Sequence, residues 1–139
     1  MRCNVADNGT INAFYGDSDY RDDGSNGQVM IYQPKFYYQR IPIELADNVA
    51  GKKIRKESII ISATPQAGFK VHPLFIGENG GELDYVLLPA YEGCVYDTSA
   101  NEYNITDKSG VNFSEDKLAS ISGAKPISGK NNALTLNNA

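Results

Sequence analysis

The sequence predicts a β-rich α+β fold, with mixed or antiparallel sheets joined by long loops. The apolar runs are short, and they are rich in the β-branched and aromatic residues that favour an extended backbone. Gly, Asn, Asp and Pro separate these runs and supply turns. The 139 residues suit a single domain. We place that domain over residues 1–123, followed over residues 124–139 by a polar tail or the start of a truncated helix.

The first elements are a hairpin and a polar loop. In residues 1–16, apolar side chains alternate on both sides of Asn8-Gly9. This dipeptide predicts a type I′ turn, because both central residues of that turn need positive φ. Residues 16–28 are acidic but lack the glycine and the closing glutamate of an EF-hand loop. We expect a solvated turn there, with a calcium site completed by distant ligands as the alternative.

Residues 28–43 hold the densest apolar and aromatic run of the chain. They predict two short strands or one bent edge strand with Pro34 at the bend, because proline has no N–H to donate to a central ladder. Residues 44–56 are polar and charged, which predicts an excursion between strands. The continuous β-branched run within residues 56–62 predicts a strand that is buried on both faces.

Residues 69–76 form a compact apolar block around His72, the single histidine of the chain. A lone histidine before a proline in such a block predicts a hydrogen-bonded structural residue rather than a ligand or a base. Residues 82–91 predict another strand, which ends or bends at its proline, and residues 92–97 predict a shorter one.

Patterning is weaker in the rest of the chain. Residues 97–115 are loop-like with a weak hairpin over 103–113, and residues 114–120 predict one helical turn capped by Ser114. Residues 133–139 look like the start of a helix that is too short to be stable alone. We therefore expect either a truncated chain or a disordered polar C-terminus.

Composition excludes several classes of function. The net charge is −4 and no basic stripe is present, so we expect no nucleic-acid binding. No run of about 18 apolar residues occurs, so we expect no membrane span. Cys3 and Cys94 match no zinc spacing. They are either one disulfide or two buried free thiols.

The sequence also lacks recognisable catalytic motifs. It has no Gly-rich phosphate loop, no GxSxG elbow and no HExxH pair. Glu82 and Asp84 share one face of a predicted strand, but a chain with 17 acidic residues contains such pairs by chance. We therefore expect no enzyme, no cofactor and no metal, and we assign no catalytic residue.

Three blocks of the sequence carry a resemblance to a known family: residues 1–10, residues 24–30 with 33–38, and residues 68–75 followed by 82–85 and 90–93. Together they resemble tail-associated proteins of bacteriophages and prophages of Gram-positive and gut bacteria. Those proteins carry a C-type-lectin-like domain similar in fold to the formylglycine-generating family. The resemblance covers about residues 1–95 well and residues 120–126 more weakly.

The resemblance implies a C-type-lectin-like fold and a non-enzymatic virion component, a tail fibre or receptor-binding protein made in the bacterial cytoplasm. Its partners would be a bacterial surface glycan or protein and other tail proteins, and it would form homo-oligomers, usually trimers. The alternatives are a structural tail-assembly domain and, less favoured, a polysaccharide-degrading enzyme. Relatives continue with an Arg-bearing helix and a Gly-Trp segment, whereas this chain has no Trp, so we expect the N-terminal part of such a protein.

The lectin-like relatives bind through their C-terminal half, so we expect the binding residues in the loops after Tyr91 or in chain beyond this sequence. The candidates are Tyr96, Tyr103 and Asn104. The copper-binding cysteines of formylglycine-generating enzymes have no counterpart, because Cys3 and Cys94 are not placed to supply them. That activity is not carried over.

Overall fold

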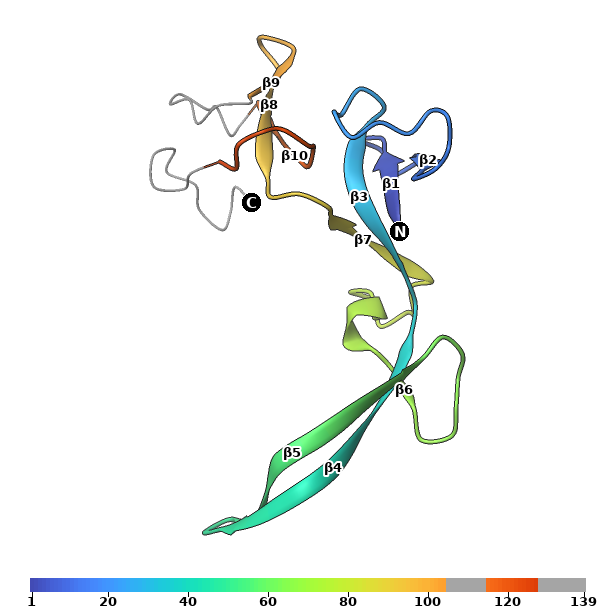
Figure 1. The fold of residues 1–139 in the computed structure, drawn as a ribbon, viewed down its shortest axis with the longest axis vertical. Coiled ribbons are helices and arrows are strands. Elements are labelled where there is room, and N and C mark those ends of the chain that lie inside the picture. Colours follow the sequence, from blue (N-terminus) through green and yellow to red (C-terminus); the bar gives the residue numbers. More distant parts are fainter. Residues whose placement is uncertain (105–114, 128–139) are drawn as a thin grey trace. The chain divides into compact units, whose positions relative to one another are not determined.

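The computed structural model describes residues 1–104 and 115–127, which form strands and almost no helix (Figure 1). The β-rich part of the predicted fold class is confirmed. The strands are β1 (Arg2–Val5), β2 (Ile11–Phe14), β3 (Gln28–Pro34), β4 (Tyr37–Asn48), β5 (Gly51–Ser62), β6 (Lys70–Val71), β7 (Tyr85–Pro89), β8 (Cys94–Asp97), β9 (Glu102–Asn104) and β10 (Lys117–Ala119). A single 3-10 turn among the described residues, η1, covers Pro73–Phe75.

The described strands form three sheets, with orders β2-β1-β3-β7, β10-β8-β9 and β5-β4-β6. Strand β1 is antiparallel to β2 and β3, β8 to β9 and β10, and β4 to β5 and β6. The chain divides into two compact units. The first comprises Met1–Tyr32 and the described residues from Leu87 onward, and the second comprises Gln33–Val86.

The predicted hairpin of residues 1–16 is confirmed, but its turn type was wrong. Gly9 has a φ of 85°, whereas Asn8 keeps a negative φ. The Gly9 N–H donates to the Ala6 carbonyl at 2.9 Å, and the Ala6 N–H donates to the Thr10 carbonyl at 2.9 Å. This is the pattern of a type I turn followed by a glycine bulge. Because the Asn8 side chain accepts from the Thr10 N–H at 2.9 Å, asparagine stabilises the turn without positive φ.

The core of the first unit is small and includes two satisfied polar side chains. The Asn4 amide donates to the Arg21 carbonyl at 2.6 Å and accepts from the Arg21 N–H at 2.8 Å. The Ser120 hydroxyl donates to the Val29 carbonyl at 2.8 Å and accepts from the Tyr91 N–H at 2.9 Å. The buried apolar residues of this unit are Cys3, Val5, Ala13, Val29, Cys94, Val95, Ala119 and Ile121. These bonds tie the acidic loop and β3 to the core.

Both cysteines are buried free thiols, which decides between the two alternatives left open by the sequence. The Cys94 thiol lies 3.4 Å from the Ala119 carbonyl, and the Cys3 thiol lies 3.6 Å from the Met30 carbonyl. Burial raises the pKa of both thiols.

Pro34 ends β3 and β4 begins at Tyr37, which confirms the prediction of two strands separated at Pro34. Strand β4 pairs with β6 only at Tyr37 and Tyr38, so beyond them it has one open edge within the described part of the chain. The expected edge position was wrong for β3, which lies between β1 and β7. Pro34 is compatible with this internal position because it is the last residue of its strand, where its missing N–H breaks no ladder bond. Pro42 lies in β4 beside a register irregularity, where a proline is also tolerated.

The second unit contains a long hairpin, in which β4 and β5 run side by side (Figure 1). The pairing runs from Tyr37 opposite Ser62 to Asn48 opposite Gly51. The predicted excursion over residues 44–56 was therefore wrong. Charged residues fit a strand here because they form cross-strand ion pairs, such as Lys52 with Asp47 at 2.5 Å.

The predicted burial of the strand over residues 56–62 was also wrong. Ile59, Ile60 and Ile61 are all exposed, so neither face of β5 is covered by another layer at these residues. A continuous apolar run shows that a strand has no polar face, but it does not show that other layers cover it.

His72 has the structural role that the sequence predicts. Its Nδ1 accepts from the Leu74 N–H at 3.2 Å and caps η1. Its ring packs against Phe36, Tyr38 and Phe75, with centroid distances of 5.0, 5.3 and 6.3 Å. Phe75 is fully buried and anchors this aromatic cluster.

The last described strands differ in part from the predictions. The strand over residues 82–91 is shorter, Tyr85–Pro89, and β8 confirms the strand in 92–97. The helical turn over 114–120 was wrong, because Lys117–Ala119 pairs with β8 as β10. Strand β9 supplies the first part of the weak hairpin, and the part over 105–114 lies outside the described residues. So does the predicted helix start at 133–139.

Candidate functional site

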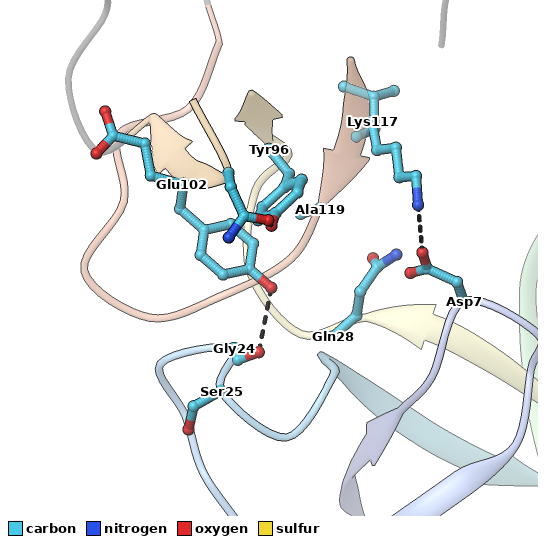
Figure 2. Close-up of a pocket in the computed structure, with 11 residues that line it drawn as sticks. Asp7, Gly24, Ser25, Gln28, Tyr96, Glu102, Lys117 and Ala119 are labelled. Atoms are coloured by element: carbon cyan, nitrogen blue, oxygen red, sulfur yellow. Dashed lines mark hydrogen bonds and ion pairs between the residues drawn. The ribbon is translucent and has the colours of Figure 1, made fainter. Parts of the chain in front are cut away.

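A pocket of about 450 Å³ lies in the first unit, between the acidic loop and the sheet of β8, β9 and β10 (Figure 2). Two aromatic residues, Tyr96 and Tyr103, line it together with Gly24, Leu118 and Ala119. Polar side chains line the remainder: Asp7, Ser25, Gln28, Asn101, Glu102 and Lys117. This volume falls in the range of small-molecule sites in proteins.

Antiparallel pairing brings the two tyrosines together. Tyr96 in β8 lies directly opposite Tyr103 in β9. Their rings meet edge to face, with centroids 5.0 Å apart and planes inclined by 69°. The Tyr96 hydroxyl donates to Asn101 Oδ1 at 2.6 Å, and the Tyr103 hydroxyl donates to the Gly24 carbonyl at 3.1 Å. Both hydroxyls therefore fix their rings in place.

Tyr103 is partly buried, and burial is the main cause that raises its pKa. It stays a neutral phenol near neutral pH, so its ring presents an uncharged apolar surface. The acidic loop closes over it at Gly24, which has a φ of 84°. A Cβ at Gly24 would lie 2.6 Å from the Tyr103 ring, so this approach requires glycine.

An ion pair forms the charged side of the pocket. Lys117 Nζ lies 2.5 Å from Asp7 Oδ2. Figure 2 marks this ion pair with a dashed line. The hydrogen bond to Asp7 raises the pKa of Lys117. The pair joins β10 to the turn after β1, and both side chains are more than half exposed. It offers a ligand one cation and one carboxylate in the pocket lining.

The structure brings two of the three predicted binding residues together. Tyr96 and Tyr103 line the pocket. Asn104 pairs with Val95 through the backbone, and its side chain lies outside the described part. Sequence reasoning missed Asp7, Gln28 and Lys117, because these come from distant segments and no local pattern marks them.

The acidic loop uses its carboxylates to build turns. Asp17 accepts from the Phe14 N–H at 2.8 Å, and Asp23 accepts from the Ser25 N–H at 2.9 Å. Asp22 accepts from the Tyr20 hydroxyl at 2.5 Å. Within residues 1–104 and 115–127, no group of three or more His, Cys, Asp or Glu residues is arranged to hold a metal ion. In the same ranges no helix is long and apolar enough to cross a membrane.

The carboxylates that the sequence singled out, Glu82 and Asp84, both bind one lysine in the second unit. Lys35 Nζ lies 3.3 Å from Glu82 and 3.1 Å from Asp84. The two acids raise the pKa of Lys35, with the Asp84 hydrogen bond the largest cause. The arrangement is that of a surface ion-pair cluster.

Comparison with known proteins adds no identification. No family model, curated protein or solved structure matches the chain. The function is therefore argued from the geometry of the pocket and from the resemblance of its sequence blocks.

Proposed function

We propose that this chain is a non-enzymatic component of a bacteriophage tail, namely a tail-fibre or receptor-binding module. It contacts a glycan or protein on the bacterial surface, is made in the bacterial cytoplasm and ends in the virion. The proposal includes a C-type-lectin-like arrangement and a homo-oligomer, for which the resemblance implies a trimer. Its support in sequence is the resemblance of residues 1–95.

The pocket lining is the single observation that carries the binding part of this proposal. The rings of Tyr96 and Tyr103 lie beside the amide of Gln28 and the ion pair of Asp7 with Lys117. A saccharide presents apolar ring faces together with hydroxyl groups that both donate and accept hydrogen bonds. Aromatic rings next to amide, carboxylate and ammonium groups match both properties. A surface glycan therefore fits this pocket better than a purely apolar ligand.

The test is a glycan array followed by titration calorimetry with the glycan that binds. Tyr96→Ala removes one of the two aromatic residues of the pocket lining and should weaken binding about tenfold or more, which corresponds to about 1.4 kcal/mol. Tyr15→Ala is the control, because Tyr15 is an exposed tyrosine of the same unit that does not line the pocket. A wild-type chain that binds neither glycans nor bacterial cells would contradict the proposal.

A second candidate is a structural tail-assembly domain. The exposed edge strand β5 favours it, because an open strand edge can pair with another protein. Capture of other tail components, without binding to host cells, would support this candidate over receptor binding.

A further inference from the structure

The β4–β5 hairpin of the second unit exposes an unusual amount of apolar side chain. Seven aliphatic residues of its two strands are exposed: Ile41, Ile43, Leu45, Ile54, Ile59, Ile60 and Ile61. Val49, in the turn between the strands, is exposed as well. The strand residues lie on both faces, because Ile59 and Ile60 are adjacent residues of one strand. Apolar exposure on this scale marks an interaction surface.

The hairpin also has open hydrogen-bonding edges. Within the described part of the chain, β5 is an edge strand along all its 12 residues. Strand β4 pairs with β6 at Tyr37 and Tyr38, and from Gln39 to Asn48 its pairing partner is β5. A two-stranded ribbon alone is marginally stable in water, and an open edge is a template for another strand. Both features call for a strand-bearing partner.

The charges along the hairpin indicate what this partner is. Strand β4 carries Glu44 and Asp47, and the facing segment of β5 carries four cations: Lys52, Lys53, Arg55 and Lys56. Inside the hairpin, Lys52 lies 2.5 Å from Asp47 and Arg55 lies 3.9 Å from Glu44. If β4 of a second copy lay along the free edge of β5, the same acidic and basic residues would face each other again. The two edges of the hairpin are thus complementary in charge.

We propose that the hairpin is the surface through which copies of this chain associate, with the free edge of β5 in one copy paired with β4 of the next. The exposed aliphatic side chains of the two strands then lie beside each other as cross-strand neighbours. The inference rests on the oligomeric part of the proposed function, and it goes further by naming the surface. It does not depend on a glycan, because the interface lies in the second unit and the pocket in the first.

A lipid membrane is a less suitable partner for the apolar side chains of the hairpin than a second copy of the chain. Three of the four isoleucines of β5, Ile59 to Ile61, lie towards the base of the hairpin, whereas Asp47, Lys52 and Lys53 flank its tip. The exposed Ile54 and Val49 lie near the tip, among these charges. Insertion would bring the charged tip into the lipid first, at a high desolvation cost. A second copy of the hairpin, in contrast, pairs these charges.

The test is the molar mass of the full chain in solution, measured by light scattering after size exclusion. Wild type should form one species with a fixed multiple of 15.2 kDa. Ile59→Lys with Ile61→Lys places two cations among the apolar side chains and should shift the mass to that of the monomer. Leu74→Lys with Leu83→Lys is the matched control, because these leucines are exposed in the same unit outside the hairpin. This control should keep the wild-type mass.

Amide hydrogen exchange gives a second measurement that does not depend on the variants. The β5 amides that point away from β4 should be protected in wild type and should exchange faster in the Ile59→Lys, Ile61→Lys chain. A monomeric wild type, a polydisperse aggregate, or a lysine variant that keeps the oligomer mass would overturn the proposal. So would a monomer that binds phosphatidylglycerol vesicles through the hairpin. Loss of glycan binding with the oligomer intact would contradict only the proposed function.

Discussion

At the scale of single residues, Asn4 is the polar side chain on which the acidic loop depends most. It is fully buried and bonds both backbone groups of Arg21. Asn4→Ala would leave the Arg21 N–H and carbonyl without these partners. We expect a loss of about 1–3 kcal/mol in the free energy of unfolding, measured by urea denaturation.

The control for this change is Asn12→Ala. Asn12 donates to the Asn26 carbonyl at 3.0 Å and is exposed, so water replaces its bond. We expect its effect to stay within about 0.5 kcal/mol. If the two variants lost the same free energy of unfolding, the buried hydrogen bonds of Asn4 would stabilise the fold no more than the exposed bond of Asn12 does.

Tyr20 gives a prediction about alkaline pH. Burial, followed by the hydrogen bond to Asp22, raises the pKa of Tyr20 from 10.0 to about 12. The folded state therefore holds this proton more tightly than the unfolded state. Its stabilising contribution is complete below pH 10 and is lost as pH rises towards about 12.

Urea denaturation at about pH 8 and about pH 11 measures this effect. Tyr20→Phe has no phenol to ionise at this position, so its free energy of unfolding should fall less between the two pH values. Tyr15→Phe keeps the Tyr20 hydroxyl and should decline as wild type does. The same decline in all three chains would refute the assignment to Tyr20.

At the scale of elements, the sequence predicted strands best where local chemistry decides them. Asn8-Gly9 marked the first hairpin, and Pro34 marked the end of β3. The β4–β5 hairpin was missed because its charged segment is stabilised by cross-strand ion pairs, which depend on register and not on local composition. For the same reason Lys117–Ala119 looked helical alone, although its pairing with β8 makes it a strand.

The contact between the acidic loop and β9 gives a prediction at this scale. Gly24→Ala adds a Cβ 2.6 Å from the Tyr103 ring and 2.7 Å from Ile121, at a φ of 84°. Gly16→Ala is a matched control, because Gly16 has a φ of 107° and open space around it. Backbone strain at positive φ should destabilise both variants by about 1 kcal/mol or more.

The difference in the free energy of unfolding between Gly24→Ala and Gly16→Ala measures the steric clash. We expect Gly24→Ala to be less stable than the control by about 1–3 kcal/mol. Thermal denaturation followed by circular dichroism measures both. Because Gly24 and Tyr103 line the same pocket, Gly24→Ala should also weaken glycan binding, whereas Gly16→Ala should not. Equal behaviour of the two variants would show that the loop does not hold Tyr103.

At the scale of the whole molecule, the site was less predictable than the strands. Tyr96 and Tyr103 were predicted because both lie after Tyr91 on one short stretch of chain. Asp7, Gln28 and Lys117 come from three other segments, and sheet pairing with β8 is what positions Lys117. Such a convergence is a property of the tertiary fold, so one sequence without aligned relatives carries no sign of it.

Binding and association make a joint prediction for cell attachment. A single open pocket gives modest affinity, whereas several pockets on one oligomer raise the apparent affinity for a surface by about 10²–10⁴. The Ile59→Lys, Ile61→Lys chain should therefore bind free glycan as wild type does, yet bind bacterial cells at least about 10²-fold more weakly. Tyr96→Ala should weaken both kinds of binding. Calorimetry with free glycan and sedimentation with cells measure the two quantities. If the lysine variant kept full cell binding as a monomer, attachment would not depend on association through the hairpin.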